Sequence, residues 1–225
     1  DHGIALLGGE TAEMPGFYGD GEYDLAGFIV GVVDRRRILD GSRVESGDIL
    51  VGLPSTGLHT NGYSLARRVF FEKMDLDPDE PVAELGRTVA DELLAVHRCY
   101  LEPVWPLLEK DRIHALAHIT GGGLTDNVPR VLPEGLRAVI KVGAWDVPPV
   151  FRILAQVGEV PEEDMWRTFN LGVGMVLVVP PKRLARVLKV LKKNGCPGFP
   201  MGNVIEGESG VEYDHPPEGF PTGLR

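Results

Sequence analysis

The chain has 225 residues, of which 43% are hydrophobic, and a formal net charge of −10. Its length allows one large or two small domains with a well-filled core. Its scattered basic residues argue against a nucleic-acid-binding surface. No apolar run approaches the roughly 20 residues of a membrane-spanning helix, and residues 1–20 carry no signal-peptide pattern.

The two cysteines, Cys99 and Cys196, lie far apart and outside any CxxC or Cys/His spacing. They therefore indicate neither a disulfide framework nor a zinc site. A reducing, cytoplasmic setting fits this cysteine usage best.

In chain order, the sequence first predicts two strands, at residues 4–9 and 23–33, separated by a loop. A charged, turn-rich stretch at 34–48 follows, and we place the domain boundary there. The next elements are a strand at 49–55 and a helix at 62–74, whose apolar residues recur on one face.

The rest of the chain alternates between strand and helix patterns. Strands are expected at 114–119, 137–142, 172–179 and 201–207, and helices at 85–110, 148–157 and 180–195. The helix at 85–110 contains Pro103 and Pro106, which can break it. This alternation predicts an α/β or α+β fold, with helices packed on a sheet.

A glycine-rich loop follows the predicted strand at 114–119. Gly121, Gly122 and Gly123 stand between this strand and a predicted helix, so free N–H groups and the helix dipole could face an anion. Thr120 could cap the helix or donate to a phosphate, and His118 could orient or protonate a substrate group. The same glycines are also consistent with a simple tight turn.

A second loop repeats this arrangement after the strand at 49–55. It carries His59, Thr60, Asn61 and Ser64 at the start of the next helix. Thr60 or Asn61 could serve only as the N-cap, which requires no ligand. Two such loops, each with a histidine near a strand end, favour a ligand site because open sheets bind ligands there.

A third loop, at residues 8–24, is acidic. Hard oxygen ligands in a glycine-bearing loop suit Mg²⁺, which proteins usually hold through one or two carboxylates and substrate phosphates. Glu10 is singled out because it directly follows Gly8 and Gly9. The other acids of the loop are expected to be solvated: Glu13, Asp20, Glu22 and Asp24.

Five segments occur in the order and with the spacing of one enzyme family. They are GGETAEMPGFY (8–18), YDLAGFIVGVV (23–33), DILVGLPSTGLHTNGYSLAR (48–67), HITGGGLTDNVPRVLP (118–133) and RTFNLGVGM (167–175). Together they resemble the phosphoribosylformylglycinamidine cyclo-ligases, also called aminoimidazole ribonucleotide (AIR) synthetases. The resemblance extends over nearly the whole chain and weakens after about residue 195.

The resemblance implies a fold and an activity. Residues 1–40 would be the C-terminal part of an ATP-binding, dimer-forming domain of ferredoxin-like, barrel-forming type, and 41–225 a substrate-binding α/β domain with a mixed sheet. The implied reaction is the ATP-dependent closure of formylglycinamidine ribonucleotide (FGAM) to AIR, with Mg²⁺. The family is homodimeric, with first-domain strands paired between subunits.

The resemblance also implies roles for individual residues. Glu10 and Thr11 would contribute to the ATP–Mg²⁺ site, with Glu10 as a metal ligand. His59 and His118 would handle protons or orient groups. The residues facing the substrate and its phosphate would be Gly57, Thr60, Asn61, Ser64, Thr120, Gly121, Gly122 and Gly123.

One departure from the family's pattern limits these expectations. The family's first domain begins upstream with a segment containing lysine, glycine and aspartate, whereas this sequence starts just before GGETAEMP. We therefore expect residues 25–33 to be exposed or paired with another chain, and the 225-residue chain alone to be catalytically incompetent.

Two alternatives remain. One is another enzyme of the same ATP-binding superfamily: formylglycinamidine ribonucleotide synthetase, selenophosphate synthetase or thiamine-monophosphate kinase. The other is a non-catalytic module that keeps a phosphate-binding or dimerising surface.

Overall fold

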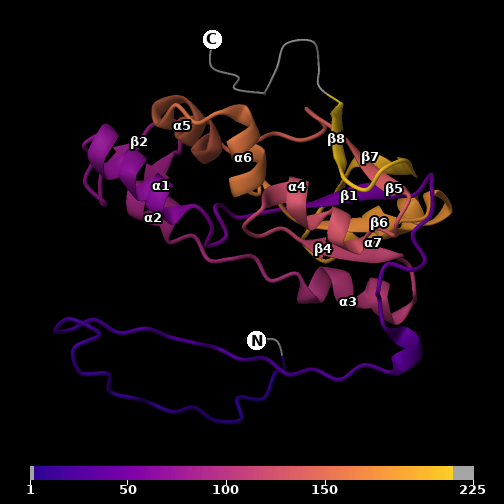
Figure 1. Ribbon diagram of the computed structural model, residues 1–225, viewed down its shortest axis with the longest axis horizontal. Helices are drawn as coiled ribbons and strands as arrows, with labels where there is room; N and C mark the ends of the chain where they lie inside the picture. Colours follow the sequence, from indigo (N-terminus) through magenta and orange to yellow (C-terminus); the bar gives the residue numbers. More distant parts are fainter. Residues whose placement is uncertain (1–2, 215–225) are drawn as a thin grey trace. The chain divides into compact units, whose positions relative to one another are not determined.

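A computed structural model describes residues 3–214 (Figure 1). The chain divides into two compact units, Asp1–Ile38 and Leu39–Arg225. The division lies inside the charged segment 34–48, where the sequence predicts the domain boundary. Residues 215–225 of the predicted second domain lie outside the described residues.

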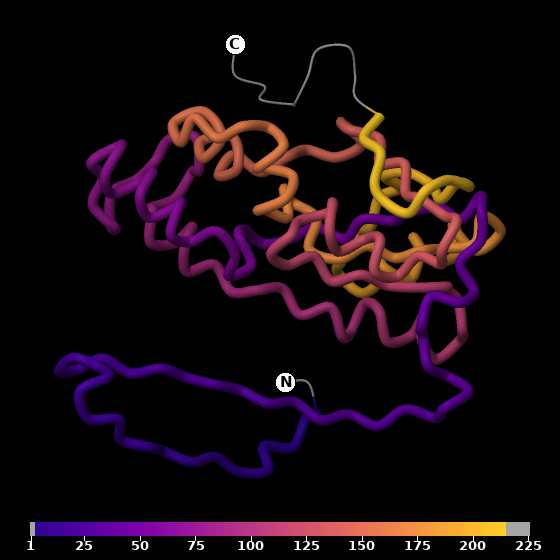
Figure 2. The backbone as a smooth tube through the Cα atoms, viewed as in Figure 1, coloured from indigo at the N-terminus to yellow at the C-terminus, as the bar shows by residue number. Residues whose placement is uncertain are grey.

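The first unit forms no strand within its described residues, so the strands predicted at 4–9 and 23–33 are wrong for this chain. Figure 2 shows its backbone as a long open loop, followed by the 3-10 helix η1 (Arg35–Arg37). A strand requires hydrogen bonds to a neighbouring strand, and no described segment provides them. Residues 25–33 are exposed, as predicted: Phe28 is 98% accessible and Val32 is 99% accessible.

A six-stranded mixed sheet forms the centre of the second unit. The strand order is β4-β6-β1-β7-β5-β8, and all neighbours are antiparallel except β5 and β8. The strands are β1 (Ile49–Pro54), β4 (Ala115–His118), β5 (Leu136–Lys141), β6 (Val173–Val179), β7 (Phe199–Glu206) and β8 (Val211–Asp214). All five strands predicted beyond residue 48 are confirmed, whereas β8 was not predicted.

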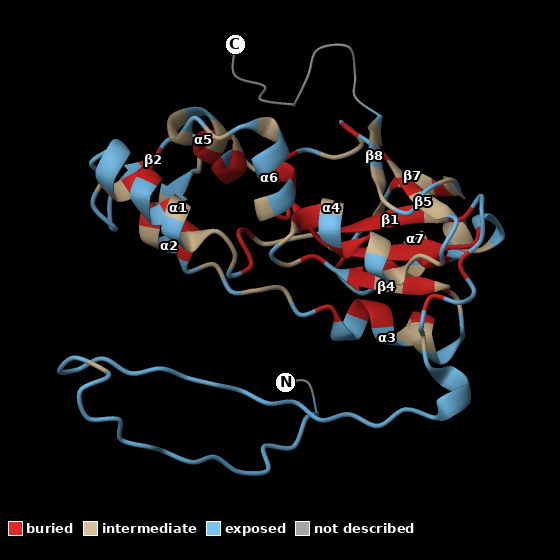
Figure 3. Cartoon of the chain, in the orientation of Figure 1, coloured by how far each residue is buried: buried red, intermediate tan, exposed pale blue. Residues whose placement is uncertain are grey.

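Both faces of the sheet are buried around β1 and β6. Successive side chains of a strand point to opposite faces, so Leu50 joins one core while Val51 and Leu53 join the other. In Figure 3 these strands are mostly red, and the chain of the first unit is almost entirely pale blue. Burial on both faces explains why these strands read as continuous apolar runs.

Two helices, α3 and α7, contribute side chains to the core on one face of the sheet. The other α-helices of the second unit contribute to the core on the opposite face. The helices are α1 (Tyr63–Arg67), α2 (Val89–Leu93), α3 (Leu101–Glu109), α4 (Gly123–Asn127), α5 (Pro149–Gly158), α6 (Glu162–Thr168) and α7 (Leu184–Lys193). Within residues 3–214, no helix has both the length and the apolar character needed to cross a bilayer.

Short elements complete the second unit. They are the π-helix η2 (Arg68–Lys73), the 3-10 helices η3 (Pro129–Val131) and η4 (Pro181–Arg183), and a two-stranded sheet of β2 (Pro81–Val82) and β3 (Arg87–Thr88). The helix predicted at 62–74 is confirmed as α1 continued by η2. The predicted helices at 148–157 and 180–195 are confirmed as α5 and as η4 with α7.

The helix predicted at 85–110 is interrupted, but not at its prolines. The break covers residues 94–100, between α2 and α3, and Pro106 lies inside α3. This break creates a segment without regular structure that carries His97.

Candidate functional site

The loops at 54–64 and 118–123 meet at one end of the sheet because of strand direction. β1 and β4 both pair antiparallel with β6, so they run parallel to each other and end on the same side. Pro54 pairs with Val173 and His118 pairs with Met175, at the beginning of β6. Three of the five segments that resemble the cyclo-ligases therefore converge at this sheet end.

The His59 side chain is buried, with 2% of the residue accessible. Its Nε2 accepts hydrogen bonds from the backbone N–H of Thr56 at 3.0 Å and of Arg98 at 3.4 Å. Burial, followed by the nearby rings of His97 and His118, lowers the pKa of His59 to about 4. His59 is therefore a neutral imidazole at pH 7, held in place by backbone donors.

Three histidines from three chain segments form a row. The ring of His97 stacks on His59 with centroids 3.9 Å apart, and the Nε2 atoms of His97 and His118 lie 3.2 Å apart. Burial lowers the pKa of His97 and of His118, and the nearby His118 lowers that of His97 further. His118 is exposed and His97 is half-buried, so His118 is the member of the row most open to a ligand.

Tyr100 supports the buried end of this row. Its hydroxyl donates to the carbonyl oxygen of Pro54 at 3.0 Å, and burial raises its pKa. A Cβ atom at Gly174 would overlap the Tyr100 hydroxyl and approach His59 Cε1 to 2.7 Å. Glycine at this position of β6 is thus required for Tyr100 and His59 to lie against the strand.

The side chain of Asn127 organises the glycine-rich loop from inside. Its Nδ2 lies within hydrogen-bonding distance of three backbone carbonyls, and the shortest of these contacts is 2.8 Å, to Gly123. Its Oδ1 accepts from the Thr120 hydroxyl at 3.3 Å. Gly123 has φ of 58°, and a Cβ there would overlap the carbonyl oxygen of Trp166. Close packing therefore explains Gly123 without a ligand.

Neither loop uses its hydroxyl or amide side chains to cap the following helix. The N-cap residues are Gly62 for α1 and Gly122 for α4, and neither makes a side-chain cap bond. The expectation that Thr60, Asn61 or Thr120 is an N-cap is therefore wrong. A left-handed backbone at Gly62, with φ of 72°, displaces the helix start past these polar residues.

The polar residues of the first loop lie beside the glycines of the second. Asn61 donates from Nδ2 to the carbonyl oxygen of His59 at 2.8 Å, and its Oδ1 would lie 3.5 Å from a Cβ at Gly121. Thr60 donates its hydroxyl to the same carbonyl oxygen of His59 at 2.6 Å. Ser64 is exposed on the first turn of α1.

A buried asparagine anchors the start of the first loop. Asn170 Nδ2 donates to the carbonyl oxygen of Gly57 at 2.9 Å. Its Oδ1 accepts from the Ser55 hydroxyl at 2.9 Å and from the Gly172 N–H at 2.8 Å. Asn170 thus fixes Gly57 to the strand end. Through this residue, the segment 167–175 holds the loop at 54–64 in place.

Sequence reasoning did not single out four residues of this site. Asn127 and Asn170 are buried and lie within the segments quoted for the resemblance, where an asparagine close to apolar residues was the available signal. Tyr100 and His97 had no local signal, because the pattern across 85–110 is helical.

Two hollows lie at this end of the sheet. An open groove of about 420 Å³ is bordered by His97 and His118 and otherwise mainly by apolar residues of α3. A smaller pocket of about 240 Å³ is lined by Ser55, Thr56 and Gly57 on one side and by Arg87 and Glu92 on the other. Arg87 is paired with Glu92, with Nε and Oε2 2.7 Å apart.

Glu10 and Thr11 belong to the first unit and are exposed. Glu10 is not part of any group of three or more potential metal ligands among residues 3–214. Its role in metal and ATP binding, and that of Thr11, remains a prediction.

Comparisons with known proteins agree with the resemblance. The chain is 53% identical over 210 residues to the phosphoribosylformylglycinamidine cyclo-ligase of Citrifermentans bemidjiense, and 50% identical over 210 residues to that of Geotalea uraniireducens. Each match covers 93% of this chain and 60% of the relative. The chain thus spans about three fifths of the length of these relatives.

The solved structure of thiamine-monophosphate kinase from Stenotrophomonas maltophilia K279a shares the fold. It aligns with a TM-score of 0.50 and 16% identity, covering 81% of this chain and 54% of that one. Residues 45–215 match the family described as AIR synthase related protein, C-terminal domain. This match spans most of the chain, which therefore belongs to the AIR synthase related protein family.

Proposed function

We propose that this chain forms the substrate-facing part of an ATP-dependent cyclo-ligase that closes FGAM to AIR, releasing ADP and phosphate. The carrying observation is that His118, backed by His97, lies at the same strand end as Asn61 and the glycine-rich loop. The names of relatives about 50% identical to the chain support the same reaction.

The chemistry of the reaction defines what these residues must do. An amide carbon is a poor electrophile until its oxygen is phosphorylated. In the proposed reaction ATP therefore phosphorylates the formamide oxygen of FGAM, and an amidine nitrogen then attacks the carbon and expels phosphate. The attacking nitrogen must lose a proton, and the substrate must be held so that the two ends of the new ring meet.

His118 is our candidate for the proton-handling group. It is exposed, and its lowered pKa keeps the imidazole neutral at pH 7, so a ring nitrogen can accept a proton. His97 would hold the ring through the Nε2 contact, and the buried His59 would position His97 by stacking. This assignment makes His59 a positioning residue rather than a catalytic one.

The substrate phosphate would be held by the two loops. Gly121 and Gly122 are accessible parts of the glycine-rich loop, and Asn61 lies beside Gly121. Backbone N–H groups and hydroxyls are suitable donors for a phosphate. We assign the same role to Gly57, Thr60, Ser64, Thr120 and Gly123, either as donors or as supports of the loop backbone.

ATP and Mg²⁺ complete the proposed reaction. Glu10 and Thr11 are our candidates for that site, and Glu10 belongs to no group of three or more potential metal ligands among residues 3–214. We expect the 225-residue chain alone to be inactive for this reason. Mg²⁺, when bound, would neutralise the charge on the transferred phosphoryl group.

We also propose that the protein is a homodimer of the cytoplasm. The exposed apolar residues at 25–33 support pairing with a second chain, because unpaired apolar segments associate readily. The cysteine usage and net charge of −10 fit a reducing compartment and small-molecule substrates.

Separate titrations of the purified chain with FGAM and with ATP test the proposal. FGAM should raise the melting temperature, and ATP should raise it much less. His118→Ala should weaken the FGAM effect while leaving the melting temperature of the free chain nearly unchanged. The exposed Glu84→Gln serves as a control that should preserve the FGAM effect.

Several outcomes would change the assignment. If neither FGAM nor ATP alters the melting temperature, a non-catalytic module is favoured instead. Stabilisation by thiamine phosphate or selenide, and not by FGAM, would indicate another member of the superfamily. Formation of AIR by the isolated chain would contradict its expected inactivity.

A further inference from the structure

A second cluster of polar side chains lies at the opposite end of β1 and β4 from the candidate site. Asp48 directly precedes β1, and His114 directly precedes β4. Because these strands run parallel, their starting ends lie on the same side of the sheet. Glu45 completes the cluster from the turn that leads into β1.

Asp48 is fully buried, at 0% accessibility, and its two carboxylate oxygens differ in their contacts. Oδ2 lies 2.7 Å from His114 Nδ1 and accepts the Glu45 backbone N–H at 3.1 Å. Oδ1 is buried and has no hydrogen-bond partner among residues 3–214. A buried carboxylate oxygen without a partner is costly, so a ligand at this position would explain it.

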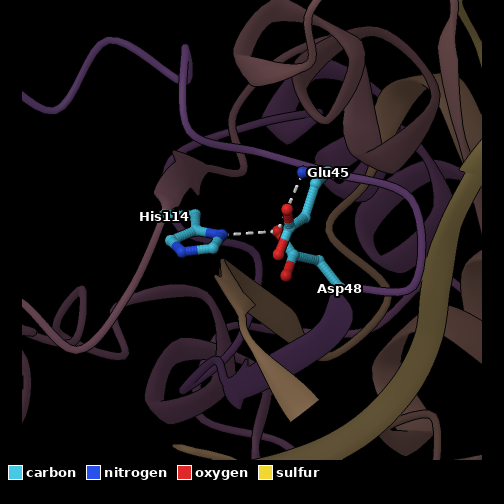
Figure 4. A group of neighbouring side chains, drawn as sticks. All are labelled: Glu45, Asp48 and His114. Carbon is cyan, nitrogen blue, oxygen red and sulfur yellow. Dashed lines mark hydrogen bonds and ion pairs between the residues drawn. The ribbon is translucent and has the colours of Figure 1, made fainter. Parts of the chain in front are cut away.

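Figure 4 shows the carboxylates of Glu45 and Asp48 close together, with the ring of His114 facing them. Each residue offers one ligand atom, and these atoms all lie within 4.8 Å of one another. Arg43, two residues before Glu45, donates to the carbonyl oxygen of Ile113 and is paired with Asp111. Two carboxylates thus face the His114 imidazole, and the guanidinium of Arg43 is paired with a different carboxylate.

We propose that Glu45, Asp48 and His114 bind a divalent transition-metal ion of the Zn²⁺ type. Two carboxylates supply the negative charge that a divalent cation requires. An imidazole ligand favours Zn²⁺ over Mg²⁺ or Ca²⁺, and three protein ligands with one water complete a tetrahedral site. The imidazole binds through Nδ1 with its hydrogen on Nε2, so its present contact to Asp48 is replaced by the metal.

The site would stabilise the domain rather than take part in ring closure. It ties the turn at 45–48 to the start of β4, an edge strand whose one neighbour within residues 3–214 is β6. It lies at the other end of the strands from His118, so binding there is independent of the function proposed above.

Zinc titration of the 225-residue chain, by calorimetry and by thermal melting, tests this site. One Zn²⁺ should bind per chain and raise the melting temperature by roughly 5–10 °C at a concentration about 100-fold above Kd. Mg²⁺ should have no comparable effect. Glu45→Gln and His114→Gln should each weaken zinc binding at least tenfold.

Two matched controls separate this site from other zinc ligands. Glu84→Gln removes an exposed carboxylate elsewhere, and His97→Gln removes a histidine of the candidate site; both should retain the zinc effect. Wild-type zinc binding in Glu45→Gln and His114→Gln would overturn the proposal, because the metal would then lie elsewhere. Absence of zinc binding by the wild-type chain would overturn it as well.

Discussion

The Nε2 atoms of His118 and His97 face each other at 3.2 Å, although the two residues come from a strand end and from an irregular segment 21 positions earlier. One ring must donate and the other accept, so the pair shares a single hydrogen at this contact. The exposed His118 is therefore positioned by a residue that no local pattern identified.

Removing His97 should change the titration of His118. Burial lowers the pKa of His118, and loss of the His97 ring admits water, so in His97→Ala the pKa of His118 should rise towards its ordinary value of 6.5. NMR titration of the His118 ring protons measures this directly. The control Val96→Ala changes the neighbouring residue and keeps the His97 ring, so it should leave the His118 titration unchanged. An equal pKa shift of His118 in Val96→Ala would refute a direct effect of the His97 ring.

His59 should make the domain less stable in acid. Its pKa is about 4 in the folded chain, compared with an ordinary value of 6.5. Above pH 6.5 the imidazole is therefore neutral in both the folded and the unfolded chain, and its contribution to folding stability is fully present. As the pH falls from 6.5 to 4, the unfolded imidazole takes up a proton first and stability is lost, by about 3 kcal/mol in total.

Urea denaturation of the wild-type chain and of His59→Gln between pH 4 and 7 measures this loss. Glutamine can still accept the Thr56 N–H, so the variant should fold and show a flatter dependence of stability on pH. Parallel curves for the two proteins would show that His59 is not responsible.

Asn170 should contribute more to stability than an exposed asparagine. Asn170→Ala leaves the Gly57 carbonyl, the Ser55 hydroxyl and the Gly172 N–H without their partner, at a cost of about 2–4 kcal/mol. The control Asn194→Ala removes one hydrogen bond on the surface, to Val190, and should cost less than about 1 kcal/mol. Chemical denaturation that gave equal losses would contradict the anchoring role of Asn170.

Gly123 and Gly135 allow the cost of close packing to be separated from the cost of a left-handed backbone. Both have positive φ, but a Cβ at Gly123 would overlap the Trp166 carbonyl oxygen, whereas nothing lies within 4 Å of one at Gly135. Gly135→Ala should cost about 1–2 kcal/mol for its left-handed backbone. Gly123→Ala should cost about 2 kcal/mol more, because the overlap adds to that term.

The exposed segment at 25–33 predicts self-association. Ile29→Pro removes a backbone donor from the middle of the segment and should shift the chain towards the monomer in sedimentation experiments. Ala12→Pro lies in the same unit but outside the segment, and should leave the distribution unchanged. A wild-type chain that is monomeric at high concentration would argue against pairing through these residues.

The sequence predicted the central strands and missed the N-terminal ones for the same physical reason. Residues 49–54 and 173–179 are apolar throughout and find neighbours within the chain, so their pattern and their pairing agree. Residues 23–33 have an equally strong pattern but no strand beside them among the described residues. Strand propensity expresses how well a residue fits a sheet, but a strand also needs a neighbouring strand to pair with.

The candidate site was predicted as far as its loops and not beyond. Strand ends followed by small polar residues identified both loops, whereas the segment bearing His97 could not be read locally. There, the carbonyl oxygen of Val96 accepts from the Thr56 hydroxyl, and the Arg98 N–H donates to His59. These long-range partners replace the helical hydrogen bonds that the pattern at 85–110 predicts.

The position of β6 between β1 and β4 determines the width of the candidate site. Two adjacent strand spacings place the ends of β1 and β4 roughly 9.5 Å apart. Backbone hydrogen bonds fix this separation, so substitutions in the two loops change the chemical groups that the loops present and leave the separation of the strand ends unchanged. The spacing of the two loops and the chemistry they offer are therefore encoded in different parts of this chain.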